Sequence, residues 1–474
     1  MNSAIKRELL RIPGVRQYAD ARRRRSGGML YKIENWVLHA LAPPAPAPPP
    51  PPPIPQPIEL PVPESVIELP TIKDIQLIAD QIRSEAQLDS EELRQLCARL
   101  EAGLADNSAD PIEAHREIGR AIYDREPGLY VSEALPSHLK RFTYPGFFSI
   151  HLNEHCNAAC FFCREQDHKG KLIDFDELHK LDSGLRMARV IELTGWGEPF
   201  FYPKLTEVVD KCFALNNSPA LLSFTTNGSM LSAEWGRKLS GRIHRLCISI
   251  NAATSETYET QMRYKNKKFT FDYVIECVRE FIAEITPEDV KRLAFHIVTS
   301  TDNFREIPAL VRLSADLGIP TITVGHYFCA NEQYLDKTLV YVKDEYNAII
   351  EEAVQLGYTC GVEVHARRFH SNEVTTMAQD TCFAPFERLY TEVPGDIAPC
   401  CFMGRHRMGN IYEEGVEAVW FSDQMQALRK SRHLPECSTC TLYNPFDDDV
   451  THLSPYLIDA RTKERRNDLY TARH

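Results

Sequence analysis

Three cysteines stand close together in the segment HLNEHCNAACFFCRE, at Cys156, Cys160 and Cys163. A C-x3-C-x2-C array on one loop offers three thiolates, which can bind three irons of a [4Fe–4S] cubane and leave the fourth iron without a protein ligand. That open iron is a place where a small chelating molecule can bind and exchange an electron. The alternative is a zinc knuckle or three incidental thiols, since thiolates also bind zinc well.

Glycines and polar residues suited to binding a ligand recur downstream. They lie in the segments Gly195-Trp196-Gly197-Glu198-Pro199, Thr225-Thr226-Asn227-Gly228 and Ser249-Ile250-Asn251, and at Arg263. Glycine lets a backbone approach a ligand closely because it has no Cβ, and a planar guanidinium suits a carboxylate. The alternative interpretation is a set of ordinary turns and a solvated arginine at a helix end.

These segments follow apolar runs that are typical of buried strands. The runs are FFSIHL, ARVIELTG, ALLSFTTNG, RLCISIN, LAFHIVTS and TITVGHYF, each followed by a helical pattern. Repeated βα units predict a parallel sheet with right-handed crossovers, and six units rather than eight predict a partial, open (β/α)6 barrel. Active sites of such barrels form at the carboxyl ends of the strands, so we expect the polar segments and the cysteine array to meet at one mouth.

The cysteine array, the aromatic Phe162 before its last cysteine and the order of the later segments resemble the radical S-adenosylmethionine (SAM) superfamily. The resemblance implies that the array holds a [4Fe–4S] cluster, which when reduced cleaves SAM to methionine and a 5′-deoxyadenosyl radical that abstracts a substrate hydrogen. In the family, the segment of Glu198 recognises the amino group of SAM, and an arginine like Arg263 its carboxylate. The implied SAM-binding positions are Phe162, Gly195, Gly197, Glu198, Pro199, Thr226, Asn227, Ser249, Asn251 and Arg263.

A second group of cysteines follows the barrel, and its surroundings resemble the SPASM/twitch extension of the same superfamily. The segments concerned are Cys382, GDIAPCC, GNIYEEGVEAVW and CSTC. The resemblance implies one auxiliary [4Fe–4S] cluster bound by Cys382, Cys400, Cys437 and Cys440, with Cys401 as the alternative to Cys400. Four thiolates also suit zinc, so a zinc site is the alternative here.

Oxidation and epimerisation are both open as outcomes of the hydrogen abstraction. An auxiliary cluster offers a sink for an electron, which suits oxidation, whereas a hydrogen-donating thiol completes an epimerisation. Cys329, just beyond the last predicted strand, is the candidate donor and His326 a candidate proton acceptor, with packing roles as the alternative for both. The remaining thiols in predicted helices and strands are interpreted as buried packing residues, namely Cys212, Cys247, Cys277 and Cys360.

A small-molecule substrate such as a carbohydrate is expected, because residues 71–140 lack the alternating strands of a peptide-binding module. Modification of a peptide or protein, as in sulfatase maturation or ribosomal-peptide tailoring, is the alternative. An alternative of another class is a non-catalytic zinc-binding scaffold. The family also implies an electron donor such as flavodoxin or ferredoxin.

Bulk composition narrows the class of protein further. The chain has 474 residues, 14 cysteines and a formal net charge of −12. An acidic chain lacks the basic footprint of a nucleic-acid binder. Without a long apolar run or a signal sequence, the protein is expected in the cytoplasm, where thiols stay reduced and disulfides are rare.

The predicted fold class is α/β, a partial (β/α)6 radical SAM barrel with a small C-terminal cluster-binding domain and an N-terminal helical, proline-rich extension. The predicted parts are a basic N-terminal segment (1–42), a proline-rich linker (43–70), an accessory helical region (71–140), the barrel (141–360), a SPASM/twitch-like domain (375–446) and a C-terminal tail (447–474). The basic segment suits weak contact with an anionic membrane surface or a partner protein; a disordered basic tail is the alternative.

Overall fold

The structure is a computed structural model, and it describes residues 72–84, 87–105, 111–163, 170–216, 218, 221–329, 331–369, 382, 384–400 and 407–432. The basic N-terminal segment, the proline-rich linker and the C-terminal tail lie outside these residues, as do Cys401, Cys437 and Cys440. The described residues all belong to the unit formed by residues 68–474.

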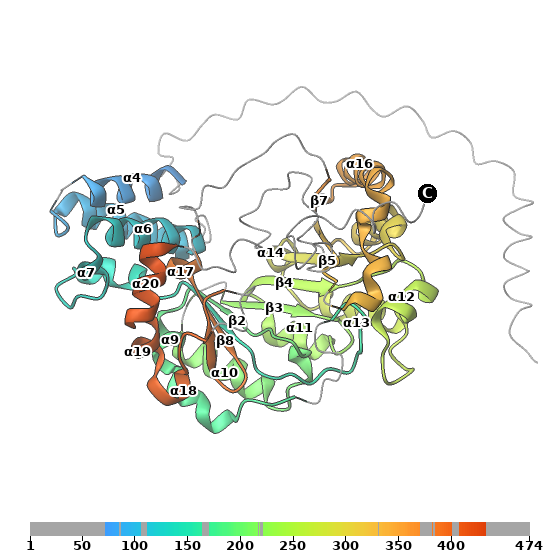
Figure 1. The fold of residues 1–474 in the computed structure, drawn as a ribbon, viewed down its shortest axis with the longest axis horizontal. Helices are drawn as coiled ribbons and strands as arrows, with labels where there is room; N and C mark the ends of the chain where they lie inside the picture. The colour runs from blue at the N-terminus through green and yellow to red at the C-terminus, as the bar shows by residue number, and fades with distance from the viewer. Residues whose placement is uncertain are drawn as a thin grey trace, which may run out of the picture. The chain divides into compact units, whose positions relative to one another are not determined.

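A largely parallel sheet forms the centre of this unit (Figure 1). Across the described residues its order is β7-β6-β5-β4-β3-β2-β1-β8-β9, and only the β8–β9 pair is antiparallel. The strands are β1 (Phe147–Ile150), β2 (Val190–Glu192), β3 (Leu222–Thr226), β4 (Ile243–Ser249), β5 (Leu293–Thr299), β6 (Thr321–His326), β7 (Glu363–Ala366), β8 (Arg388–Glu392) and β9 (Asp396–Ala398).

Helices precede, alternate with and follow the strands. They are α4 (Ile72–Arg83), α5 (Glu91–Ala105), α6 (Pro111–Arg125), α7 (Pro127–Tyr130), α8 (Ser137–Lys140), α9 (Asp182–Met187), α10 (Leu205–Leu215), α11 (Ala233–Leu239), α12 (Ser255–Met262), α13 (Phe271–Ile282), α14 (Pro287–Val290), α15 (Ile307–Asp316), α16 (Lys343–Cys360), α17 (Ala384–Glu387), α18 (Ile411–Glu414), α19 (Val416–Trp420) and α20 (Asp423–Ser431). In the described part of the chain, none of them combines the length and the apolar character that crossing a bilayer requires.

Side-chain caps mark where several barrel helices begin. Ser232, Thr254 and Thr270 each accept a hydrogen bond from the backbone N–H three residues later, at the starts of α11, α12 and α13. Such caps satisfy a donor that the helix itself leaves free. They end each loop after a strand at a defined residue, and these loops carry the candidate site.

The six predicted strands are confirmed as β1 to β6, joined in sequential parallel order. The structure adds β7 beside β6, and β8 beside β1. Neither is a continuous apolar run: β7 reads EVHA and β8 reads RLYTE. Short polar strands of this kind escape a search for buried apolar segments, which explains why the sheet is wider than predicted.

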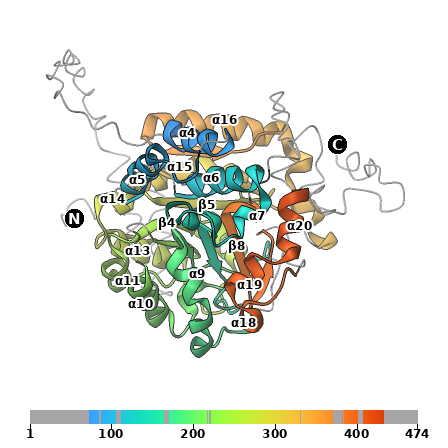
Figure 2. The same cartoon turned by 90° about the vertical axis from the view of Figure 1, so that its left-hand side faces the viewer.

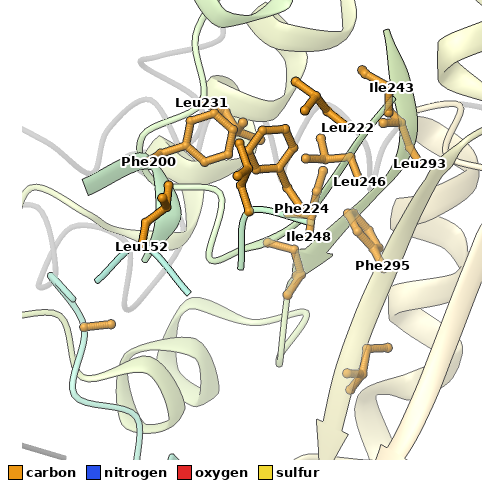
Figure 3. Packing of buried hydrophobic residues seen from close by; sticks show 14 of the residues in the cluster. Leu152, Phe200, Leu222, Phe224, Leu231, Ile243, Leu246, Ile248, Leu293 and Phe295 are labelled. Atoms are coloured by element: carbon orange, nitrogen blue, oxygen red, sulfur yellow. The ribbon is translucent and has the colours of Figure 1, made fainter. Parts of the chain in front are cut away.

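One face of the sheet is packed with apolar side chains. Leu222 and Phe224 of β3, Leu246 and Ile248 of β4, and Phe295 of β5 are fully buried there (Figure 3). Burying such a side chain stabilises the fold by roughly 1.5–3 kcal/mol. This packing makes the sheet a rigid support for the loops at the ends of its strands.

The accessory helices are confirmed as helical and pack on the C-terminal region rather than standing alone (Figure 2). Phe386 of α17 is buried in the core of α4, α5 and α6, with its ring 5.5 Å from that of Tyr123 and 6.1 Å from that of Tyr130. The Tyr123 hydroxyl donates to the Gln426 carbonyl of α20. The two regions that flank the barrel in sequence therefore share one core.

Candidate functional site

The cysteine array lies on the loop that follows β1, with all three thiols half-buried. The end of α12 holds this loop: the Ala159 N–H donates to the carbonyls of Met262 and Arg263, both at 3.2 Å. The Cys160 thiol also donates to the Met262 carbonyl at 3.4 Å. Arg263 ends α12 in the left-handed conformation, with φ of 49°. This turn presents both carbonyls to the cysteine loop.

The loop after β3 makes a second attachment to the cysteine loop. The Asn227 amide donates to Asn157 Oδ1 at 2.9 Å, and the Asn157 amide donates to Ser229 Oγ at 2.8 Å. Asn227 Nδ2 also lies 3.8 Å from Cys156 Sγ. The first thiol of the array is thus in direct contact with one of the segments predicted to bind SAM.

The three thiols lie close together in a buried loop. Burial raises the pKa of Cys156 to about 12, and burial followed by the neighbouring Cys156 and Cys163 raises the pKa of Cys160 well above its usual range. The three thiols are therefore close enough to influence one another. Coordination to a metal centre deprotonates such thiols outright.

No three His, Cys, Asp or Glu side chains converge as ligands of a single metal ion in the described part of the chain. A cubane does not require such convergence, because each thiolate binds a different iron. The donor set, its loop and its burial fit a [4Fe–4S] cluster.

Glu198 is buried at the centre of the loops after β2 and β3. Its carboxylate accepts hydrogen bonds from Thr226 Oγ1 at 2.6 Å, the Asn227 N–H at 2.7 Å and the Phe200 N–H at 3.2 Å. Burial raises its pKa to about 7 despite these donors. The carboxylate ties the two loops together and sets the position of Asn227.

The glycines after β2 make room for neighbouring protein groups. A Cβ at Gly195 would lie 1.6 Å from His151 Cδ2, and one at Gly197 would lie 2.5 Å from the carbonyl oxygens of Asn153 and His155. His151 Nε2 accepts the Trp196 N–H at 2.6 Å. These glycines allow the loops after β1 and β2 to touch, whereas the sequence suggested close approach to a ligand.

The remaining predicted SAM positions differ in how open they are. Asn251 is fully buried: its Oδ1 accepts the Val298 N–H at 2.7 Å, and its carbonyl accepts Asn303 Nδ2 at 2.8 Å. Ser249 is half-buried at the end of β4, and Arg263 is exposed. The Arg263 guanidinium lies 5.6 Å from the Phe161 ring on the cysteine loop.

Aromatic side chains surround the cysteine loop. The Phe161 ring lies 5.5 Å from Phe162, 5.3 Å from Tyr327 and 5.8 Å from Tyr334. Phe162 itself is half-buried, and Pro199 is buried at the start of η3 (Pro199–Phe201). The segment after β6 therefore reaches the cysteine loop through Tyr327.

The two predicted catalytic side chains flank Tyr327, whose ring contacts Phe161 of the cysteine loop. Cys329 is fully buried, and its thiol donates to the Asn331 carbonyl at 2.9 Å. The His326 ring stacks on Phe369 at 4.7 Å and lies 5.0 Å from Tyr346 of α16. His326 therefore faces the helix that covers β6.

Among the thiols interpreted as packing residues, Cys212 and Cys277 are buried as expected. The interpretation is wrong for Cys360, which is exposed at the end of α16. Cys247 is half-buried on β4. Both depart from a fully buried position for a local reason: one ends a helix, and the other points to the polar side of its strand.

The C-terminal candidates can be placed only in part. Cys382 and Cys400 are half-buried and lie before α17 and after β9. Gly395, in the turn between β8 and β9, has φ of 110°, and a Cβ there would lie 2.2 Å from the Tyr412 ring. Only glycine fits this turn without strain and without a clash, which explains the glycine at the start of the GDIAPC segment.

Several residues that shape the site were missed in the sequence. His151, Asn157, Ser229 and Met262 contact the cysteine loop or the glycine segment. Only Asn157 had a usable signal, because it follows Cys156 directly. The others act through contacts between distant loops, which no local pattern reveals.

Comparison with known proteins gives three similarities. The iron–sulfur cluster-binding domain named SPASM matches residues 382–441. The chain is 20% identical, over 335 residues, to the tungsten-containing aldehyde ferredoxin oxidoreductase cofactor-modifying protein of Pyrococcus furiosus, covering 64% of this chain and 88% of that protein. It is 25% identical, over 175 residues, to the probable GTP 3′,8-cyclase of Metallosphaera sedula, covering 36% of this chain and 52% of that protein.

Among solved structures, Streptococcus suis SuiB bound to its precursor peptide SuiA matches with a TM-score of 0.49 and 15% identity, over 74% of this chain and 86% of that one. With the SPASM match, the cysteine array and the parallel sheet in place, the chain is a radical SAM superfamily enzyme with a SPASM iron–sulfur domain near its C-terminus.

Proposed function

We propose that this enzyme reductively cleaves SAM at a [4Fe–4S] cluster held by Cys156, Cys160 and Cys163, and uses the resulting radical to abstract hydrogen from a small molecule. When bound, the cluster supplies the electron that splits SAM into methionine and a 5′-deoxyadenosyl radical. The main support for the proposal is the set of hydrogen bonds that link the loops after β1, β2 and β3 around Cys156.

Within this proposal, the chain's residues divide into those that contact SAM and those that position others. Arg263 is exposed beside the cysteine loop, so its guanidinium is available to the SAM carboxylate. Ser249, half-buried at the end of β4, is available to the ribose. Arg263 Nε donates to the Thr260 carbonyl at 3.2 Å, so its terminal N–H groups are the ones that would meet the SAM carboxylate.

Glu198 and Asn251 act as positioning residues, because their polar groups already hold other parts of the chain. Glu198 fixes Asn227 and Thr226, which then face the SAM site. Gly195, Gly197 and Pro199 shape the loop, and Phe162 covers the cluster side. A preorganised polar site of this kind needs no rearrangement at the moment of reaction.

One auxiliary [4Fe–4S] cluster, bound by Cys382, Cys400, Cys437 and Cys440, completes the proposal. It would accept one electron from the substrate radical, which on also losing a proton becomes the oxidised product; this favours oxidation over epimerisation. The buried position of the Cys329 thiol also favours oxidation, since a hydrogen donor must reach the substrate radical. A flavodoxin or ferredoxin would supply electrons to the first cluster.

A small-molecule substrate is supported by two observations. The accessory region is built of helices throughout its described residues, with no strands to extend a bound peptide. The names of two relatives also refer to small molecules, a cofactor and GTP.

The test is anaerobic incubation of the iron-loaded, dithionite-reduced protein with SAM, followed by chromatography for 5′-deoxyadenosine. Wild type is expected to form it, and the C156A/C160A/C163A variant is not. The control is Cys360→Ala, which removes an exposed thiol far along α16 and should retain the activity. Cleavage by the triple variant would refute the assignment.

A further inference from the structure

The strands at the centre of the sheet carry polar residues on the face opposite the apolar core. Along β4, Leu246 and Ile248 are buried, whereas Arg245 is exposed and Cys247 and Ser249 are half-buried. Parallel strands are normally buried on both faces and read as continuous apolar runs. The alternation in β4 shows that this strand turns apolar side chains to the core on one face and polar ones to the other.

The polar residues of neighbouring strands lie side by side. Ser249 pairs with His296 of β5, and His296 pairs with Thr323 of β6. On the other side, Ser149 of β1 pairs with Glu192 of β2, and Ser149 Oγ donates to its carboxylate at 2.9 Å. The polar face is defined here by Ser149, Glu192, Arg245, Cys247, His296 and Thr323, and the register continues it to Glu363 and His365 of β7 and to Arg388 and Tyr390 of β8.

Arg245 is the cation at the centre of the polar face. Its Nη2 donates to Thr323 Oγ1 at 3.4 Å, two strands away, and crosses β5 where Ala294 has no long side chain to obstruct it. No ion pair with a carboxylate is formed by Arg245 within the described residues. Burial raises the pKa of the Cys247 thiol, and Arg245 opposes this shift through its charge and a hydrogen bond. With two weak partners, the exposed guanidinium retains other N–H groups for a ligand.

Arg388 of β8 shows what a satisfied arginine looks like in the same sheet. It pairs with Glu387, donates to the Tyr390 hydroxyl at 3.3 Å and lies over the Phe147 ring at 4.6 Å. The Arg388 guanidinium is therefore bound on several sides by protein groups. Arg245 has no comparable set of partners.

The face around Arg245 also carries neutral donors and two carboxylates, Glu192 and Glu363. Burial, and then Arg245, lower the pKa of His296, so its imidazole is neutral at pH 7. Thr323 is a hydroxyl donor. Glu192 is bound by Ser149, and Arg388 and Arg245 also act on its charge. Glu363 lies 3.2 Å from His365 of the same strand. Because both carboxylates have partners of their own, Arg245 and its neutral donors match an added oxyanion.

Resting on the proposed radical SAM function, we propose that Arg245, with Thr323 and His296, binds an oxyanion of the substrate, either a carboxylate or a phosphate. Arg245 precedes the end of β4 by four residues, which is about 13 Å at the rise of a strand. The oxyanion is therefore anchored within the sheet, and the rest of the substrate extends toward the loops around Cys156.

The test is protection of Arg245 from phenylglyoxal, which modifies arginine side chains. Iron-loaded wild type is treated anaerobically with and without inorganic phosphate or acetate, at constant ionic strength set with chloride, and each modified arginine is identified by peptide mass spectrometry. Modification of Arg245 should slow about tenfold when the anion is at roughly ten times its Kd. The reference is Arg237, an exposed arginine paired with Glu284, whose rate should not change.

The two anions distinguish the chemistry: protection by acetate points to a carboxylate, and protection by phosphate alone points to a phosphate. Absence of protection by both, or equal protection by chloride, would overturn the proposal. Protection by SAM alone would also overturn it, because the oxyanion would then belong to SAM.

A variant comparison supports the chemical one. The Kd of inorganic phosphate or acetate, measured by NMR titration, should rise about tenfold or more in Arg245→Gln and remain at the wild-type value in Arg237→Gln. An unchanged Kd in Arg245→Gln would contradict the assignment. SAM cleavage by the same wild-type preparation is measured separately. Protection of Arg245 without SAM cleavage would refute the proposed function and leave the oxyanion site standing. SAM cleavage without protection of Arg245 would refute the oxyanion site and leave the proposed function standing.

Discussion

The two cysteine regions of this enzyme are built in different ways. The loop after β1 holds Cys156, Cys160 and Cys163 within a few residues, and neighbouring loops of the same barrel fix it through Asn157, Asn227 and the end of α12.

The C-terminal region spreads Cys382 and Cys400, with the predicted ligands beyond them, over a longer stretch of chain. Its described part is held by packing against the accessory helices, through Phe386 and Arg429. A compact motif thus reveals its chemistry locally, whereas a dispersed one depends on how distant elements pack.

The largest expected effect separates the two cysteine sets by activity. Formation of 5′-deoxyadenosine should be lost in C156A/C160A/C163A and remain measurable in the variant with Cys382, Cys400, Cys437 and Cys440 replaced by alanine. The reason is that SAM needs the open iron of a three-thiolate cluster. Equal loss in both variants would contradict the assigned division between the regions.

The next effect concerns the packing that holds the C-terminal region. Arg429 is fully buried, donates to the carbonyls of Pro385 at 2.9 Å and Trp420 at 2.8 Å, and lies over the rings of Tyr130 and Trp420. Arg429→Ala leaves both carbonyls without these donors, so the free energy of unfolding should fall by about 3 kcal/mol.

Chemical denaturation measures the effect of Arg429→Ala, and Lys430→Ala is the control because that side chain is exposed on the same helix. The control should change stability by less than about 0.5 kcal/mol. A loss of similar size in both variants would show that Arg429 does not hold the C-terminal region.

A smaller effect is expected at the loops around Cys156. Glu198→Gln removes one acceptor from the carboxylate that holds Thr226 and Asn227. The Kd of SAM should rise about tenfold, equivalent to about 1.4 kcal/mol. Equilibrium binding of labelled SAM measures it, with Glu207→Gln, an exposed residue of α10, as the control. An unchanged Kd would mean that this carboxylate does not position the SAM site.

Much of the barrel was predictable because its signals are local. Six apolar runs predicted β1 to β6, and the spacing of Cys156, Cys160 and Cys163 predicted their common loop. The alternation of polar and apolar residues in RLCISIN also indicated a polar face on β4. Detecting a strand from its apolar content alone, however, does not show which residues share a face.

What could not be predicted depends on contacts between distant segments. A Cβ at Gly195 would collide with His151, and the Glu198 carboxylate accepts hydrogen bonds from the next loop. His326 stacks on Phe369, which lies beyond α16 in the sequence. Each of these results follows from packing after the sheet forms, so no motif could indicate it.

The account is tested most directly by iron, acid-labile sulfide and zinc analysis of the anaerobically purified full-length protein. Two cubanes predict about eight irons and about eight sulfides per chain, falling to about four of each in C156A/C160A/C163A. Zinc without iron or sulfide in the wild type would contradict the central claim.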